Sequence, residues 1–237
     1  MKYMGSKNRI AKHLLPIILK DREEGQWYVE PFVGGANMID KVDGNRIGAD
    51  SNKYLIALLN EMSKDGYSSP YVTKEQFDLV KGNKNEYDDW YVGFVGFQLS
   101  FSAMWFGSYR RDNQGVRDYA SEAKRNVDKQ SMNVKKCKFI NSEYSYLEIP
   151  NKSIIYCDPP YEGTAKYKAV DDFNHAEFWQ WCRDKAKEGH RVFISEYNAP
   201  EDFVCVWQQE LNVSVAKDGK HKKAIEKLFI HESQVNN

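Results

Sequence analysis

The sequence of 237 residues predicts an α/β fold built on a largely parallel sheet. Apolar runs of strand length alternate with stretches whose apolar residues recur at helical spacing, which is typical of βαβ units. The hydrophobic share of 41% and the charged share of 29% are those of a globular protein. A chain of this length can form one large domain, or a domain with a sizeable insertion.

The first sixty residues are predicted to form two helices and two strands. An apolar stripe through residues 10–18 predicts a helix that begins near Ser6. Strands are predicted at residues 26–30 and 46–50, and a second helix is predicted to begin at Asn52.

The pattern then changes, and only helical periodicity remains. Helices are predicted to begin near Thr73 and Asp88, and a loop rich in glycine and arginine is predicted at residues 107–117. Residues 101–106 are interpreted as the core face of a helix rather than a platform on which bases stack. Residues 63–134 are therefore expected to form a helical insertion.

Strands return after the insertion, with one long helix between the second and third of them. Residues 1–62 and 135–237 are thus expected to form one domain that the insertion interrupts. The five later strands are predicted at residues 138–141, 153–157, 191–195, 204–207 and 227–231, and the helix at residues 173–188.

The charges balance, with 34 basic and 34 acidic residues. A neutral chain is a weak argument against a nucleic-acid partner, because phosphate binding usually requires a basic surface. Basic residues nevertheless cluster at 110–117, 124–138 and 217–227. Runs of charge are more often solvated surface than binding sites, so these clusters only permit such a partner.

Neither a metal site nor a membrane segment is expected. The four cysteines lack the Cys/His spacing of metal sites, and two lie in apolar runs, where a thiol acts as a small hydrophobe. No apolar run reaches membrane-spanning length, and the first residues lack the apolar core of a signal peptide. We therefore expect a protein of the reducing cytoplasm.

The stretch Asp158-Pro159-Pro160-Tyr161 directly follows the buried strand predicted at 153–157. Proline fixes its own φ and holds the preceding residue extended. The Asp158 carboxylate and the Pro159 carbonyl can then converge on one amino group, with Tyr161 beside it as a flat surface. Such a turn suits a planar base with an exocyclic amine. The alternative is a plain tight turn after a core strand.

A second motif is the glycine turn at residues 33–36, which follows the strand predicted at 26–30. Glycines let a backbone approach a ligand closely. Asp50 ends the next strand, where an acidic group can accept hydrogen bonds from ribose hydroxyls; its alternative role is a helix N-cap. The pair favours an adenosine-bearing cofactor without a pyrophosphate. The start of the chain, residues 3–7, is by itself interpreted as solvated, with Ser6 as a helix cap.

Four motifs stand in a characteristic order: Tyr3-x-Gly5-x-Lys7, Glu30-Pro31-Phe32-x-Gly34-Gly35, Ala49-Asp50-x-Asn52 and Asp158-Pro159-Pro160-Tyr161. In this order the chain resembles the Dam-like, or alpha-group, adenine-N6 DNA methyltransferases over essentially its whole length. The sequences of residues 3–7 and 105–107 are similar to those of phage or prophage members. Residues 220–228 resemble the family's last strand.

The resemblance implies a Rossmann-like S-adenosylmethionine-dependent methyltransferase sheet with helices on both faces. It implies S-adenosylmethionine as cofactor, double-stranded DNA as partner, and a target adenine flipped out of the duplex. Residues 63–134 would be the DNA target-recognition region, in a monomer or weak dimer in a bacterial or phage-infected cell. Residues 110–117 lack the family's usual Asn-x-Pro-x-Gly ending, so the recognised DNA sequence is not predicted.

The resemblance and the basic clusters together give the candidate site residues. The catalytic candidates are Asp158, Pro159, Pro160 and Tyr161. The cofactor-binding candidates are Tyr3, Lys7, Glu30, Phe32, Gly34, Asp50, Glu143, Tyr144 and Asp158. The DNA-binding candidates are Arg110, Arg111, Asn113, Arg117, Lys124, Lys222 and Lys223.

Two alternative functions stay open. The first is methylation of another amino group: cytosine N4, an RNA adenine or a protein glutamine. Cytosine-N4 enzymes more often have Ser, and glutamine enzymes Asn, at the position of Asp158. The second is a catalytically silent DNA-binding regulator, which the intact Asp158–Tyr161 motif and Lys7 disfavour.

Overall fold

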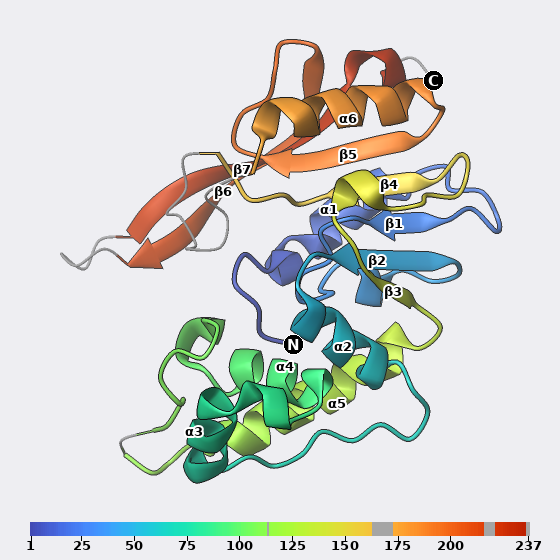
Figure 1. Ribbon diagram of the computed structural model, residues 1–237. Helices are drawn as coiled ribbons and strands as arrows, with labels where there is room; N and C mark the ends of the chain where they lie inside the picture. The colour runs from blue at the N-terminus through green and yellow to red at the C-terminus, as the bar shows by residue number, and fades with distance from the viewer. Residues whose placement is uncertain (113, 163–172, 216–220, 236–237) are drawn as a thin grey trace. The chain divides into compact units, whose positions relative to one another are not determined.

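The computed structural model describes residues 1–112, 114–162, 173–215 and 221–235 (Figure 1). Within them, seven strands form a mixed sheet in the order β3-β2-β1-β4-β5-β7-β6. The pairs β2–β3, β1–β4 and β4–β5 are parallel, whereas β5–β7 and β6–β7 are antiparallel. This arrangement confirms the predicted α/β fold. The strands are β1 (Tyr28–Glu30), β2 (Arg46–Asp50), β3 (Lys138–Asn141), β4 (Ile154–Cys157), β5 (Arg191–Glu196), β6 (Phe203–Val215) and β7 (His221–His231).

The chain divides into two compact units. The first comprises Met1–Lys12 and Val33–Leu147, and the second comprises His13–Phe32 and Glu148–Asn237. The α-helices are α1 (Ala11–Ile18), α2 (Lys53–Met62), α3 (Lys74–Gly82), α4 (Asp89–Gln98), α5 (Tyr119–Val134) and α6 (His175–Lys187). Short 3-10 helices are η1 (Lys7–Arg9), η2 (Ile39–Lys41), η3 (Lys84–Glu86), η4 (Phe101–Ala103), η5 (Tyr144–Tyr146) and η6 (Glu232–Gln234).

Four of the strands have the predicted bounds to within one residue. β2 and β3 span the predicted residues, and β4 and β5 differ from prediction by one residue. The predicted bounds of β6 and β7 were wrong, because both strands are much longer. Residues 208–212 of β6, four of which are polar, pair with residues 223–227 of β7. Backbone hydrogen bonds extend these strands beyond the short apolar runs on which the prediction was based.

Side-chain caps explain where the helices begin. Asn52 accepts hydrogen bonds from the first turn of α2, as the predicted start requires, and Thr73 forms a capping box with Gln76 at α3. The first helix begins later than predicted. Ser6 caps the short η1, accepting from the Asn8 amide at 3.3 Å, and α1 starts only at Ala11.

A buried arginine connects the end of α5 to β2. The Arg46 guanidinium donates to the carbonyls of Asn133 (2.8 Å), Lys135 (2.8 Å) and Ile39 (3.2 Å). The last carbonyls of a helix have no partner within the helix, so the hydrogen bonds to Asn133 and Lys135 satisfy acceptors at the end of α5. The inserted helices are thereby fixed to the strand that ends at Asp50.

The interpretation of residues 101–106 as a helix face was wrong. Helix α4 ends at Gln98, and the chain forms the turn η4, in which Ser102 and Ala103 have φ values of 55° and 56°. Phe101 is 58% exposed. An apolar composition predicted burial here, but left-handed residues turn the backbone out of the helix.

Helices α2 and α4 of the first unit approach each other at Gly93. A Cβ there would lie 2.2 Å from the Tyr54 carbonyl oxygen. We expect Gly93→Ala to lower the free energy of unfolding by about 1–3 kcal/mol, as overpacking does. This loss should exceed the gain in helix propensity of about 1 kcal/mol. Urea unfolding would measure it.

The matched control is Gly82→Ala at the end of α3, where a Cβ would have no atom within 4 Å. This variant should be as stable as the wild type or slightly more stable. Equal stability of the two variants would contradict the close approach of α2 and α4.

Candidate active site

The first group of predicted cofactor residues surrounds the Gly34-Gly35 turn in the first unit. Gly34 has a φ of 47°, a left-handed conformation that glycine adopts without strain. A Cβ on Gly34 would lie 3.0 Å from the Tyr3 ring, and one on Gly35 would lie 2.5 Å from the Tyr3 Cβ. The structure therefore brings Tyr3 and Gly34 together, and only glycine permits that approach.

Asp50 organises the same turn from the end of β2. Its carboxylate accepts hydrogen bonds from the amides of Gly34 (3.2 Å) and Asn52 (3.0 Å). Burial raises the pKa of Asp50, and the two amides oppose that shift. Asn52, and not Asp50, is the N-cap of α2. A carboxylate has about four acceptor positions, so Asp50 can accept further donors such as ribose hydroxyls. This geometry fits an adenosine-bearing ligand.

The start of the chain is built into the first unit rather than solvated. The Gln98 side chain binds Lys2 like a neighbouring strand, since its oxygen accepts from the Lys2 amide and its nitrogen donates to the Lys2 carbonyl, both at 3.0 Å. The Tyr3 ring packs 5.4 Å from that of Phe97. Lys7 is buried, with its ammonium 3.4 Å from the Gly5 carbonyl.

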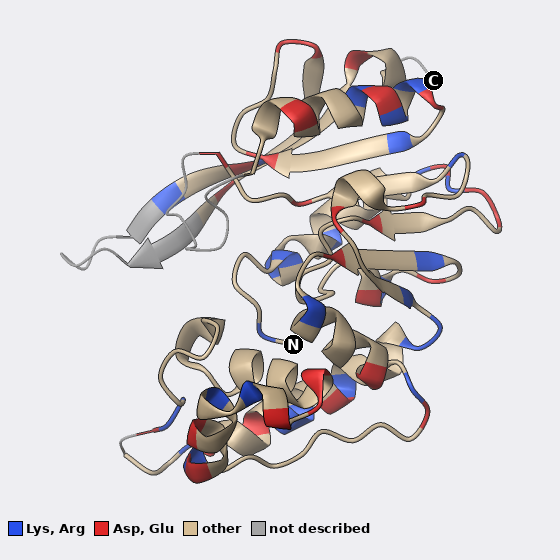
Figure 2. Cartoon of the chain, viewed as in Figure 1, with Lys and Arg blue, Asp and Glu red and all other residues tan. Residues whose placement is uncertain are grey.

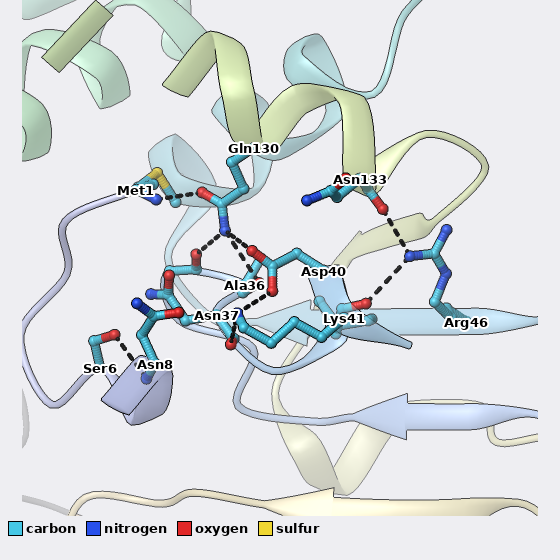
Figure 3. Close-up of polar contacts among 12 residues, drawn as sticks. Met1, Ser6, Asn8, Ala36, Asn37, Asp40, Lys41, Arg46, Gln130 and Asn133 are labelled. Carbon is cyan, nitrogen blue, oxygen red and sulfur yellow. Dashed lines mark hydrogen bonds and ion pairs between the residues drawn. The ribbon is translucent and has the colours of Figure 1, made fainter. Parts of the chain in front are cut away.

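Gln130 of α5 connects this segment to the glycine turn (Figure 3). Its nitrogen donates to the carbonyls of Gly35 (3.0 Å) and Ala36 (3.1 Å) and to the Asp40 carboxylate (2.9 Å). Its oxygen accepts from the Met1 amino group at 2.5 Å. Gln98 and Gln130 were not among the predicted site residues, because their partners lie far away in the sequence.

Glu143 and Tyr144 lie close in sequence to the residues that contact the backbone of Asp50. The Asn141 side chain donates to the Asp50 carbonyl at 2.9 Å, and the Ser142 amide donates to it at 3.2 Å. Glu143 follows directly and is exposed. Its role beside a bound adenine remains a prediction.

The second unit contains the predicted catalytic turn. Asp158 follows β4 and is half-buried, and Pro159 is buried. The Tyr161 hydroxyl donates to the Glu226 carboxylate at 2.8 Å, and the Tyr161 ring meets the Tyr197 ring edge-on at 4.7 Å. Burial raises the pKa of Tyr161 well above its ordinary value, so the hydroxyl remains a donor. Tyr161 is thus held at both its ring and its hydroxyl.

Glu196 at the end of β5 binds the exit of this turn. One carboxylate oxygen accepts from the Glu162 amide at 3.2 Å, and the other from the Tyr197 amide at 2.7 Å. Burial raises the pKa of Glu196 to about 7, although both amides oppose that shift. The sequence analysis missed Glu196, Tyr197 and Glu226. A signal existed for Glu196, because parallel strands β4 and β5 end at one sheet edge.

Glu30 and Phe32 lie in the second unit, on and just after β1. Glu30 is buried near Tyr28, and burial raises the pKa of that tyrosine well above its ordinary value. Phe32 packs edge-on against Phe178 (5.6 Å) and Phe173 (5.9 Å). Both residues have structural contacts, and their contact with a cofactor remains a prediction.

Two of the predicted DNA-binding arginines meet at one tyrosine in the first unit. The guanidinium of Arg110 lies 3.8 Å from the centroid of the Tyr119 ring, and that of Arg117 lies 4.8 Å from it. Arg117 also pairs with Glu122 at 2.9 Å. Figure 2 shows Lys and Arg interspersed with Asp and Glu along the helices of this unit.

The remaining basic candidates differ in their surroundings. Lys124 donates to Ser68, the Ser69 carbonyl and Asp128, so its ammonium has three acceptors within the unit. Arg111 is exposed.

The last candidates concern β7 and the loop before α5. Lys223 of β7 pairs with Glu210 of β6 at 2.6 Å. Lys222 lies in β7, but its side chain is outside the described part of the chain, as is Asn113 altogether. None of these contacts tests DNA binding.

Within the described ranges, no group of three His, Cys, Asp or Glu side chains is placed to hold a metal ion. Nor does any helix in the same ranges have the length and apolar character needed to cross a membrane.

The contacts of Gln130 allow a test of its part in this arrangement. Gln130→Leu would leave buried carbonyls and Asp40 without its N–H donors. Each such group costs about 1–3 kcal/mol, so we expect unfolding free energy to fall by about 2 kcal/mol or more. Urea unfolding would measure the loss. Gln114→Leu, at an exposed position, is the matched control and should change little. Equal stability of both variants would contradict the role of Gln130.

Comparison with known proteins identifies the family of the chain. The model of the family described as D12 class N6 adenine-specific DNA methyltransferase matches residues 3–202. The Type II methyltransferase M.FokI of Planomicrobium okeanokoites is 22% identical over 187 residues, which are 68% of this chain. This chain spans 28% of that relative's length.

Among solved structures, SMU.472 complexed with SAH matches with a TM-score of 0.41 and 14% identity, over 96% of this chain and 52% of the other. The family match covers most of the chain and confirms the resemblance seen in its motifs. The chain belongs to the D12 class of N6 adenine-specific DNA methyltransferases, a family that depends on S-adenosylmethionine.

Proposed function

We propose that this protein transfers the methyl group of S-adenosylmethionine to the exocyclic N6 amine of adenine in double-stranded DNA. The observation that carries the proposal is the turn at Asp158–Tyr161, which follows β4 and whose tyrosine is held at its ring and hydroxyl. Family membership supports the same activity.

Asp158 and Pro159 have the acceptors that this reaction needs. Adenine N6 is a weak nucleophile, because its lone pair is delocalised into the ring. The Asp158 carboxylate and the Pro159 carbonyl can each accept one N6 hydrogen, which favours a pyramidal nitrogen with a localised lone pair. Positive charge develops on that nitrogen during the reaction, so these acceptors stabilise the transition state more than the ground state. S-adenosylmethionine supplies an activated methyl group when bound.

Tyr161 supports the proposal as a stacking surface. An adenine inside a duplex cannot reach a concave site, so it must be flipped out at a cost of a few kcal/mol. Stacking on an aromatic ring contributes about 1–3 kcal/mol and would offset much of that cost. The contacts of Tyr161 with Glu226 and Tyr197 fix the ring before the base arrives.

We assign cofactor binding to the first unit. Asp50 would accept the ribose hydroxyls, and the Gly34 turn would let the ligand approach the backbone closely. Tyr3 lies beside this turn. Lys7 belongs to the same N-terminal segment, in which Gln98 binds the backbone of Lys2. Glu30, Phe32, Glu143 and Tyr144 remain further candidates for contact with the cofactor.

We assign DNA recognition to the inserted residues 63–134. Arg110 and Arg117 carry guanidinium groups suited to phosphates or guanine edges. Phe101 and Met104 are exposed apolar side chains on a turn with left-handed residues, and apolar side chains of this kind can enter a base stack. With DNA as the substrate, we place the protein in the cytoplasm of a bacterial or phage-infected cell, as a monomer or weak dimer.

The role of Asp158 leads to a direct test. Asp158→Ala should abolish methyl transfer while the protein stays folded, because the variant lacks the charged acceptor for the N6 hydrogens. Incorporation of radioactive methyl groups into DNA would measure activity, and thermal unfolding would monitor the fold. Asp65→Ala, at an exposed position, is the control and should retain activity. Near-normal turnover of Asp158→Ala would end the proposal.

The role of Asp50 can be tested without activity. Asp50→Asn keeps the shape of the side chain but removes its charge. Hydrogen bonds to charged groups contribute about 1.5–3 kcal/mol, so we expect affinity for S-adenosylhomocysteine to fall about 10- to 100-fold. Isothermal titration calorimetry would measure it. Asp43→Asn serves as the control, and an unchanged affinity of Asp50→Asn would place the cofactor elsewhere.

A further inference from the structure

Glu196 is a buried carboxylate that the proposed reaction does not use directly. It ends β5 and is only 2% exposed. Its two oxygens accept from the amides of Glu162 and Tyr197. Glu162 is the first residue after the Asp158–Tyr161 turn, so one end of the Glu196 carboxylate fixes the peptide that leaves that turn.

The second oxygen of the Glu196 carboxylate is linked to Tyr161 through Tyr197. Tyr197, whose amide Glu196 binds at 2.7 Å, meets the Tyr161 ring edge-on at 4.7 Å. Glu196 therefore acts on Tyr161 from two sides, through the peptide that follows it and through the ring that packs against it. Glu226 holds the hydroxyl separately at 2.8 Å.

We propose that Glu196 is a positioning residue for the methyl-transfer site, which fixes the Tyr161 ring through the Glu162 amide and the Tyr197 side chain, and does so in its ionised form. This inference rests on the proposed function, because the ring is assumed to receive the adenine. Protonation would convert one carboxylate oxygen into an O–H donor, which cannot also serve both N–H groups.

The surroundings of Glu196 place its ionisation near neutral pH. The nearby carboxylates of Asp158 and Glu162 disfavour its charge, and Glu226 lies on the adjacent β7. Lys227 of β7 stands opposite Glu196 in the strand register and is the nearby basic residue on that strand. Burial is the largest cause of the pKa of about 7. The rate of methyl transfer should therefore rise with pH through about 7.

Stability should show the opposite dependence. The folded-state pKa of Glu196 is raised above its ordinary value of 4.5. The protonated form is therefore favoured by folding, and the stability that Glu196 contributes is present below that value and is lost as pH rises through about 7. Glu196→Gln cannot titrate, so this part of the pH dependence should disappear in the variant.

The experiment compares Glu196→Gln with Glu201→Gln, an equivalent change at an exposed position after β5. The kcat and KM of DNA methylation would be measured from pH 5.5 to 9. We expect kcat of Glu196→Gln to fall about tenfold or more, because losing about 1.4 kcal/mol of transition-state stabilisation is a tenfold loss of rate. The KM for S-adenosylmethionine should stay unchanged. The wild-type inflection near pH 7 should be absent from Glu196→Gln and present in Glu201→Gln.

A second measurement does not depend on catalysis or on any variant at position 196. The carboxyl carbon of Glu196 and the ring of Tyr161 would be followed by NMR in the wild type as pH changes, with Tyr161→Phe to assign the ring. The Tyr161 signals should shift along the Glu196 titration. A kcat of Glu196→Gln within twofold of the wild-type value would overturn the positioning role. So would Tyr161 chemical shifts that do not change as Glu196 titrates.

The two proposals fail in different ways. If the wild-type protein methylates no adenine, the proposed function is rejected. If the Tyr161 signals still shift as Glu196 titrates in that protein, the coupling of the two residues is nevertheless supported. Active wild type with an equally active Glu196→Gln would reject the positioning role alone.

Discussion

The structure depends on two carboxylates, the half-buried Asp50 and the buried Glu196, which stand at the ends of strands and accept hydrogen bonds from the backbone of neighbouring loops. Asp50 at the end of β2 binds the glycine turn and the start of α2. Glu196 at the end of β5 binds the exit of the Asp158–Tyr161 turn and the residue after its own strand. In each unit, one carboxylate fixes two stretches of backbone that regular secondary structure does not hold. Irregular loops thereby acquire the precision that a binding site needs.

Side-chain amides fix the start of the chain by hydrogen bonds in a similar way. Gln98 binds both backbone groups of Lys2, and Gln130 binds two carbonyls, a carboxylate and an amino group. An amide has both donors and an acceptor, so it can replace a neighbouring strand where none is present. The helices that carry these residues belong to the segment we assign to DNA recognition. The same helices thus also support the turn we assign to the cofactor.

The sequence predicted features that depend on local chemistry. The bounds of β2 and β3 followed from apolar runs, and the starts of α2 and α3 from residues that cap helices. Four short motifs in a fixed order identified the family, because each of them is a local stretch of sequence. The partners of the Asp158–Tyr161 motif could not be predicted, because Glu226 lies 65 residues away and meets Tyr161 only through the sheet. The length of β6 and β7 was missed because the prediction was based on the apolar runs at residues 204–207 and 227–231, whereas the pairing continues through polar residues such as Gln208 and Glu226.

The antiparallel pairing of β7 with β5 has a consequence for the changes of length that this protein can tolerate. Consecutive side chains of a strand point to opposite faces, so a slip of one residue moves the Glu226 side chain to the other face of the sheet. The phenol of Tyr161 would then lose its carboxylate acceptor on that face. Insertions in β7 between Glu226 and the residues paired with β5 should therefore be rare among functional relatives, whereas changes of length farther out towards His221 should be common.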